Sequence, residues 1–347
     1  MNSIAYTDDW RDNGRIEIID VRSPSEFKID HIPGSINIPI LNDEERHKVG
    51  ITYKQVNPFK AKILGASLVS KNISKFLNTE LSNKKGSWSC LIYCWRGGQR
   101  SRSLAIILNE IGWRVKILKG GYKSYRKKII NELNVMPKFD FKIIQAQTGT
   151  AKTKILDNLN FLNAQVLDLE RLANHRGSLL GKEIKESQPS QKYFETLIHE
   201  NLNKFNPSKP VFLESESSKI GNLHLPIKLW EKLNSSERIL LRAPLIKRVE
   251  FLINEYGHLT DDPSLIKPFL DGMKGRYSNT TIKYWSELIE NKSWDDFVQN
   301  ILEIHYDPMY AYSEKKHIEK IKCKINLSNL DKLSIDNTAK KILDYFQ

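Results

Sequence analysis

The residues best suited to chemistry lie in one glycine-rich segment, YCWRGGQRSRS at 93–103. Cys94 begins the reactive part of this segment, and two glycines after it would let the backbone turn its N–H groups towards the sulfur. Two arginines add positive charge, so the surroundings favour the nucleophilic thiolate and would hold an oxyanion against it. The alternative is a structural cysteine that closes a strand, the role expected for Cys90. The predicted catalytic residues are Cys94, Arg96 and Arg100, and the predicted anion-binding loop residues are Trp95, Gly97, Gly98, Gln99 and Ser101.

A second loop with phosphate-binding character, QTGTAKT at 147–153, follows the expected strand FKIIQA at 141–146. It resembles a P-loop, in which backbone amides and a lysine hold phosphates at a helix N-terminus. Ala146 and Ala151 stand where that motif has glycines, and an alanine with positive φ carries a steric cost and crowds a bound phosphate. We therefore expect the loop to hold a diphosphate rather than to hydrolyse a nucleotide; the alternative is a loop retained for packing. The residues predicted to bind the diphosphate are Thr148, Gly149, Thr150, Lys152 and Thr153.

Polar residues also follow two other apolar runs of the second half, where functional groups gather beside a parallel sheet. Their carboxylates could hold a metal, cap a helix or pair with an arginine, and no metal site is assigned. The aromatic stretch HYDPMYAY at 305–312 could pack in a core or line an apolar pocket. The candidate second-domain site consists of Asp168, Glu170, His175, Arg176, Ser178, Glu214 and Glu216.

The elements around these loops alternate between strands and helices. RIEIIDVR, CLIY and RVKIL are apolar runs of strand length, and the apolar residues of 104–111 fall on one face of a helix. Such alternation predicts a mostly parallel sheet covered on both faces, and Pro137 ends the first pattern. The sequence therefore predicts an α/β protein with two domains. Residues 1–137 form a parallel-sheet domain, and residues 138–347 form a P-loop-like α/β domain with a helical C-terminal part.

The chain of 347 residues carries a formal net charge of +13. Much of the positive charge lies at 96–128, where two tyrosines interleave with the cations, and a second basic run lies at 313–324. Such patches can be solvated helix faces, but beside a reactive thiol they favour a polyanion such as nucleic acid. The residues predicted to bind RNA are Lys119, Lys123, Arg126, Lys127 and Lys128.

Three cysteines, at positions 90, 94 and 323, provide neither a disulfide framework nor a four-ligand metal site. The N-terminal residues lack a basic region followed by an apolar one, and no apolar run approaches the length of a membrane span. We therefore expect a cytoplasmic protein in a reducing compartment, without membrane contact.

The first domain resembles the rhodanese-like domains. DVRSPSEF, HIPGSINIP, CWRGGQRS and KGGY carry the resemblance. Five residues separate Cys94 from Arg100, whereas sulfur-transferring rhodaneses usually have four, and the longer loop suits a tetrahedral, phosphate-like anion. Phosphatases of rhodanese ancestry share the longer loop, so a phosphatase is an alternative, although no general acid can be assigned.

Along almost its whole length the chain resembles one family, the tRNA 2-selenouridine synthases. DVRSPSEF, ERHKVGITYKQ, YCWRGGQRS, GGYKSYR, DLERLANHRGS, QPSQKYFE and YDPMY occur in the order that this family shows. Ser215 and Ser218 depart from its pattern, because the family typically has an acid and an arginine there.

The resemblance implies an enzyme that exchanges sulfur for selenium at the wobble 2-thiouridine of tRNA anticodons. It implies an S-geranyl intermediate made from geranyl diphosphate, followed by replacement with selenium from selenophosphate. Cys94 would accept selenium transiently or guide its delivery, and the second loop would hold the diphosphate. No cofactor is expected to be firmly bound, the use of Mg²⁺ and the oligomeric state stay open, and an enzyme that supplies selenophosphate is a further expected partner. Two alternatives remain: a sulfurtransferase or phosphatase acting on a small anion, and a non-catalytic RNA-binding protein.

Overall fold

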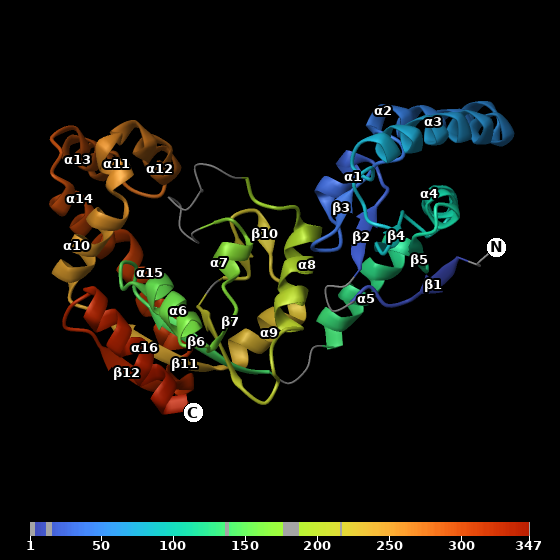
Figure 1. Ribbon diagram of the computed structural model, residues 1–347. Helices are drawn as coiled ribbons and strands as arrows, with labels where there is room; N and C mark the ends of the chain where they lie inside the picture. The colour runs from blue at the N-terminus through green and yellow to red at the C-terminus, as the bar shows by residue number, and fades with distance from the viewer. Residues whose placement is uncertain (1–3, 12–15, 136–138, 176–186, 216, 347) are drawn as a thin grey trace. The chain divides into compact units, whose positions relative to one another are not determined.

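The computed structural model describes residues 4–11, 16–135, 139–175, 187–215 and 217–346. The chain separates into two units, each with its own parallel sheet (Figure 1). The first unit comprises Met1–Leu133 together with Pro189–Glu200, and the second comprises Asn134–Gln188 and Asn201–Gln347.

The sheet of the first unit has five parallel strands in the order β1-β5-β4-β2-β3. Its central strand is β4, where the residues CLIY are all buried, as expected of a strand covered on both faces. The strands are β1 (Ala5–Thr7), β2 (Glu17–Asp20), β3 (Ile36–Asn37), β4 (Ser89–Tyr93) and β5 (Arg114–Leu118).

Helices carry the chain between these strands. In α4, the buried side chains of Leu104 and Leu108 stand four residues apart and pack with Ile92 of β4 in one core. A single π-helical turn, η1, joins α2 to α3. The helical elements of the first half are α1 (Pro24–Ile29), α2 (Asp43–Ile51), η1 (Thr52–Val56), α3 (Pro58–Asn78), α4 (Gln99–Glu110) and α5 (Gly121–Val135).

The segment Pro189–Glu200, which holds most of α8 (Gln191–Leu202), packs with the first unit. The Thr196 hydroxyl donates a hydrogen bond to Asp30 at 2.9 Å, and Arg126 forms an ion pair with Glu195. This segment falls within residues 138–347, the predicted second domain. Its position in the first unit depends on contacts between residues far apart in the chain, which no local pattern encodes.

The sheet of the second unit also has five parallel strands, in the order β12-β11-β6-β8-β7. One face packs against α6 and α16 around Ile144, Phe212 and Leu241. The strands are β6 (Asp140–Ala146), β7 (Gln165–Val166), β8 (Pro210–Glu214), β11 (Glu237–Arg242) and β12 (Ile321–Asn326), with a small antiparallel pair, β9 (Lys219–Ile220) and β10 (Leu223–His224).

A second core in this unit is wholly helical. It gathers Phe269, Trp285 and Phe297 between the helices that follow β11, which Figure 1 shows grouped at one end of the unit. The helical elements of the second unit are α6 (Lys152–Phe161), α7 (Leu169–Leu172), α9 (Ile227–Ser235), α10 (Leu245–Glu255), α11 (Gly257–Asp261), η2 (Pro263–Ile266), α12 (Lys267–Met273), α13 (Asn279–Glu290), α14 (Trp294–Ile301), η3 (Leu302–Tyr306), α15 (Asp307–Lys316), η4 (Ile318–Lys320) and α16 (Lys332–Phe346).

The predicted fold class is confirmed: two α/β units with parallel sheets, the second with a helical part near its C-terminus. Among the described residues, no helix is both long enough and apolar enough to span a membrane.

Candidate functional site

The first candidate site is the loop between β4 and α4, which begins at Cys94. The sulfur is almost fully buried, with 3% of the residue exposed. The amide of Gly98 donates to Cys94 Sγ at 3.3 Å, and Ser101 Oγ lies 3.3 Å from the same sulfur. Because α4 begins at Gln99, its N-terminal end also faces this loop. The Gly98 amide and the N-terminal end of α4 therefore suit a negative charge on this sulfur, whereas the Ser101 hydroxyl also donates to the Gly98 carbonyl at 3.1 Å.

Two glycines allow the backbone to pack closely behind this sulfur. Gly97 has φ of +64°, and Gly121, in the KGGY segment, has φ of +57°. A Cβ on Gly121 would lie 2.2 Å from the Cys94 carbonyl oxygen and 2.5 Å from the Gly97 nitrogen. The Tyr122 amide donates to that same carbonyl at 2.8 Å. The KGGY segment thus packs directly against the Cys94 loop, and only glycine fits at position 121.

The two predicted catalytic arginines occupy different environments. Arg100 forms an ion pair with Glu26 of α1, with Nη1 and Oε2 at 2.7 Å. Burial tends to raise the pKa of Glu26, but the Arg100 guanidinium outweighs this and lowers the pKa below its usual value. Arg96 is exposed and forms no ion pair with any residue that the structure describes. Arg96 is therefore the arginine available to an incoming anion, whereas Arg100 is shared with Glu26.

A buried ion pair fixes the strand end beside this loop. Arg22 and Asp20 are both nearly unexposed and lie 2.6 Å apart, and Arg22 also donates to the Asp30 carbonyl. The guanidinium stacks 4.0 Å from the ring centre of Tyr122. Asp20 and Arg22 belong to the DVRSPSEF motif, and their contact with each other was not predicted from the sequence.

The second candidate site is the loop between β6 and α6. Gly149 has φ of +82°, and a Cβ there would lie 3.0 Å from the Arg248 carbonyl oxygen. Ala151 also has positive φ, 57°, so it adopts the left-handed conformation that the P-loop motif normally gives to glycine. Ala146, in contrast, ends strand β6 and needs no glycine. Lys152 begins α6, with its ammonium 5.9 Å from the ring centre of Tyr310.

The buried side chain of Arg248 stabilises this loop by hydrogen bonding to its backbone. Arg248 of α10 donates through Nη1 to the Thr148 carbonyl at 3.2 Å. It binds both carboxylate oxygens of Asp307, at 2.8 and 2.7 Å. Asp307 belongs to the YDPMY motif at the start of α15. No local sequence pattern predicts the pairing of Arg248 with Asp307, because the two residues meet only after folding.

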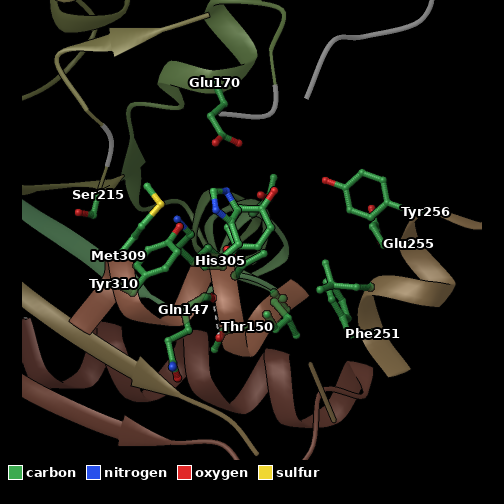
Figure 2. Close-up of a pocket in the computed structure, with 18 of the residues that line it drawn as sticks. Gln147, Thr150, Glu170, Ser215, Phe251, Glu255, Tyr256, His305, Met309 and Tyr310 are labelled. Carbon is green, nitrogen blue, oxygen red and sulfur yellow. Dashed lines mark hydrogen bonds between the residues drawn. The ribbon is translucent and has the colours of Figure 1, made fainter. Parts of the chain in front are cut away.

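A cavity of about 1120 Å³ opens beside the P-loop, within the second unit. Figure 2 shows Phe251, Glu255 and Tyr256 on one side of it, with Ser215 and Met309 opposite. The stretch 305–312 takes both roles left open for its aromatics, because Tyr306 and Tyr310 line the cavity and Tyr306 also packs against the helical core. Its polar lining includes Thr148, Gly149, Thr150, Lys152, Thr153, Asp168, Glu170 and His175, and its aromatic and aliphatic lining includes Phe251, Tyr256, Leu259, Phe269, Trp294, Phe297, Ile301, Leu302, Tyr306 and Tyr310.

The predicted polar residues of the second half take mixed roles. Asp168 caps α7 by accepting the Arg171 amide at 2.8 Å, and burial raises the pKa of its carboxyl group. Glu214 accepts a hydrogen bond from the Glu170 amide at 3.2 Å. Within the part of the chain that the structure covers, no group of three or more His, Cys, Asp or Glu residues could hold a metal ion. Three members of the candidate site lie outside the described residues: Arg176, Ser178 and Glu216.

One wall of the cavity contains a buried cation that the sequence analysis did not find. Arg238 donates to Gln145 at 3.3 Å and to Ser215 at 3.0 Å, and it has no carboxylate partner among the described residues. Burial lowers the pKa of Arg238 to about 10. Burial, together with the charge of Arg238, also lowers the pKa of His317 to about 4. The cavity thus combines a largely apolar lining with a buried cation, Arg238, in its wall.

Of the five residues predicted to bind RNA, four lysines are exposed, Lys128 among them, and one arginine is largely buried. Arg126 is largely buried in its ion pair with Glu195, and the Lys128 ammonium lies 4.7 Å from the ring centre of Trp10. Lys119 is exposed and 3.9 Å from Asp8. Lys123 and Lys127 are exposed.

Comparison with known proteins finds a matching family model in each half of the chain. A family model described as the tRNA 2-selenouridine synthase AAA domain matches residues 139–265, and the model of the rhodanese-like domain matches residues 3–128. A tRNA 2-selenouridine synthase of Hydrogenovibrio crunogenus is 32% identical over 347 residues, which cover 90% of this chain and 92% of that protein. The enzyme of the same name from a Sulfurovum species is 30% identical over 343 residues, covering 90% and 93%. That of Nitrosomonas europaea is 36% identical over 251 residues, covering 69% and 63%.

Proposed function

Because the chain belongs to the tRNA 2-selenouridine synthase family, we propose that it replaces the sulfur of the wobble 2-thiouridine in tRNA with selenium. The two candidate sites suit two different chemical stages. The second unit would alkylate the sulfur, and the first unit would deliver selenium.

The observation that carries this proposal is the cavity beside the P-loop. Geranyl diphosphate has a multiply charged anionic head and an apolar, branched tail. Lys152, the loop amides and the N-terminal end of α6 suit the head, because such groups bind phosphates. The aromatic and aliphatic wall from Phe251 to Tyr310 suits the tail. An ordinary nucleotide site would not need so large an apolar lining.

Alkylation would proceed with the thione sulfur of the base as nucleophile. Sulfur attacks the first carbon of the geranyl group, the carbon–oxygen bond breaks, and diphosphate leaves with the electron pair. Lys152 and the loop amides would stabilise the charge that develops on the departing diphosphate. The base loses its N3 proton, so the product is neutral S-geranyl-2-thiouridine. Alkylation turns a poor leaving group into one that departs as a thiol.

Selenium delivery would then take place at Cys94. Selenophosphate is a tetrahedral anion, and the loop amides and exposed Arg96 would provide donors and positive charge for it. Cys94 would hold the donor in place as a thiolate that guides delivery. The selenium of selenophosphate attacks C2 of the S-geranyl base, the C2–S bond breaks and geranylthiol leaves, and water then cleaves the Se–P bond to release phosphate. The base must leave its stack to reach either site, as it does in other enzymes that act on a nucleobase. We also propose a cytoplasmic location and an enzyme that supplies selenophosphate as a partner.

Mass spectrometry of tRNA nucleosides tests both stages. A strain lacking the gene is complemented with the natural chain, with Cys94→Ala or with Lys152→Ala. We expect the natural chain to restore 2-selenouridine. Cys94→Ala should lose selenium and accumulate S-geranyl-2-thiouridine, whereas Lys152→Ala should leave 2-thiouridine unmodified.

Three outcomes would contradict the proposal. Selenation by Cys94→Ala would remove the role of the thiolate, and geranylation at the natural rate by Lys152→Ala would remove the diphosphate assignment. Turnover of thiosulfate or an aryl phosphate without any change in the nucleosides would favour a small-anion sulfurtransferase or phosphatase instead.

A further inference from the structure

The α2–α3 hairpin, residues 43–78, carries seven cations against three carboxylates, and the carboxylates, Asp43, Glu44 and Glu45, all lie at its start. From residue 46 to residue 79 the sequence has seven lysines or arginines and no acidic residue. All seven cations are exposed, and none forms an ion pair with another described residue. They are Arg46, Lys48, Lys54, Lys60, Lys62, Lys71 and Lys75. A solvated helix face normally mixes both signs of charge, so this surface calls for an acidic partner.

Large apolar side chains lie exposed among these cations. Tyr53 and Val56 of η1 are 55% and 63% exposed, and Phe59 and Ile63 of α3 are 68% and 58% exposed. Phe59 and Ile63 share a helix face, because residues four apart are neighbours, and Lys62 stands three residues from Phe59. Aromatic rings interleaved with lysines suit single-stranded nucleic acid, whose bases stack on the rings while its phosphates meet the cations.

The base of the hairpin lies at the same edge of the sheet as Cys94. Strands β3 and β4 both run parallel to β2, so the chain leaves each of them at the same edge. There Asp43, the first residue of α2, accepts the Ser25 amide at 3.1 Å. The neighbour of Ser25 in α1 is Glu26, which is ion-paired with Arg100 just after the Cys94 loop. A short series of contacts thus joins the hairpin to the reactive loop.

The hairpin itself is held together by packing and hydrogen bonds. Asn72 of α3 donates to the Glu45 carboxylate at 2.7 Å and to the Ile40 carbonyl at 3.1 Å. Val69 and Ile73 of α3 are buried in the core of the first unit. Figure 1 shows α2 and α3 side by side at the border of that unit. The exposed cations and rings therefore lie on helices that are packed into the core of the first unit.

We propose that the α2–α3 hairpin binds the single-stranded RNA around the modified base and directs that base towards Cys94. This inference rests on the proposed function, since it requires tRNA as the substrate. The phosphates would contact Lys54, Lys60 and Lys62, and unstacked bases would lie against Tyr53 and Phe59. These residues replace Arg126 as the main RNA contacts, because Arg126 is engaged with Glu195.

Filter binding of a tRNA transcript tests the surface with two matched variants. The hairpin variant is K54Q/K60Q/K62Q, and the control is K85Q/R114Q/K116Q, which removes equal charge from exposed positions in or before the strands β4 and β5. Glutamine retains good helix propensity, so the hairpin should stay folded. We expect tRNA Kd to rise at least tenfold for the hairpin variant and less than threefold for the control.

The salt dependence gives a second readout. Each lost phosphate contact reduces the slope of log Kd against log salt by roughly 0.7–0.9. The hairpin variant should therefore show a slope lower by about 2. A third variant, Y53A/F59A, should weaken binding of an unpaired anticodon loop at least fivefold while leaving the slope unchanged, because stacking carries no charge.

Several results would overturn the inference. Equal affinities of the hairpin variant and the natural chain would remove it, as would equal losses in both charge variants. A change of oligomeric state in the hairpin variant, seen by light scattering, with unaltered tRNA affinity would assign the surface to a second copy of the chain. If the natural chain neither binds nor modifies tRNA, the proposed function itself fails, and that outcome is distinct from a variant-specific null result.

Discussion

Replacement of Arg248 by methionine should destabilise the P-loop by removing hydrogen bonds to its backbone and to Asp307, without changing a residue that contacts the bound diphosphate. Arg248 is 3% exposed and provides three hydrogen bonds, two to Asp307 and one to the Thr148 carbonyl. Methionine fills much of the same volume but provides none of them. Asp307 would then lose its counterion, and the carbonyl of the loop would lose its donor.

The size of the effect follows from the burial of the pair. Removing one partner of a fully buried ion pair costs about 3–5 kcal/mol. The Asp307 side chain is 22% exposed, so water would partly solvate the remaining carboxylate, and the lower end is appropriate. We expect a loss of about 3 kcal/mol from the free energy of unfolding of the second unit, or a fall in Tm of roughly 6–12 °C.

A double-mutant cycle measured by urea unfolding gives the assay. It compares Arg248→Met, Asp307→Asn and the double variant. Since each single change removes the same pair, the double variant should lose about 2 kcal/mol less than the sum of the singles. The matched control is Lys247→Met on the same helix, which breaks an exposed pair with Glu250 at 2.8 Å and should cost less than about 1 kcal/mol. Calorimetry should also show geranyl diphosphate binding at least tenfold weaker in Arg248→Met.

Strict additivity of the two single changes would refute this reasoning, because independent sites add and coupled ones do not. Natural affinity for geranyl diphosphate in a destabilised Arg248→Met protein would show that the arginine supports the fold but not the loop. Equal losses in Arg248→Met and Lys247→Met would show that burial has no special weight here.

Three further predictions concern other positions. Gly121→Ala should abolish selenium transfer, because its Cβ would lie 2.2 Å from the Cys94 carbonyl oxygen, whereas Gly86→Ala, whose Cβ meets nothing within 4 Å, should not; nucleoside mass spectrometry compares them. Ala151→Gly should change the free energy of unfolding by less than about 1 kcal/mol, because relief of the left-handed strain is offset by greater chain entropy in the unfolded state and by loss of a buried methyl group. Ala151→Val should be clearly destabilising, and urea unfolding measures both variants. Burial and neighbouring cations lower the pKa of His317 from 6.5 to about 4, so between these pH values the unfolded chain binds a proton that the folded chain does not. The contribution of neutral His317 to the free energy of unfolding should therefore be fully present above pH 6.5 and fall as the pH drops towards 4. His317→Gln should flatten this dependence in urea unfolding at several pH values.

Much of the protein could be predicted from local sequence. The strand CLIY, the helix at 104–111 and the glycine-rich Cys94 loop are each encoded within a few residues, because periodicity and glycine placement act over one or two turns of chain. The same holds for the P-loop, although the sequence did not distinguish Ala151, which has positive φ, from Ala146, which does not. The seven motifs also identified the family correctly.

Other features needed the folded chain. The charge run 119–128 suggested one RNA surface, yet Arg126 turned inward to Glu195, whose segment joins the first unit from far along the sequence. The α2–α3 hairpin was available as a basic sequence, but the exposure of Tyr53 and Phe59 is a result of packing. Hydrophobic spacing alone does not reveal which apolar residues find a partner.

The sequence by itself determined the two loops, their order and the chemistry of their side chains, since a loop and its flanking elements are contiguous in the chain. The tertiary structure decided which arginines are paired: Arg100 with Glu26 and Arg248 with Asp307. It also decided that residues from 147 to 317 enclose one cavity. The physical reason is that such contacts depend on the packing of separate helices and strands, and their stability is shared over the whole unit rather than stored in any short segment.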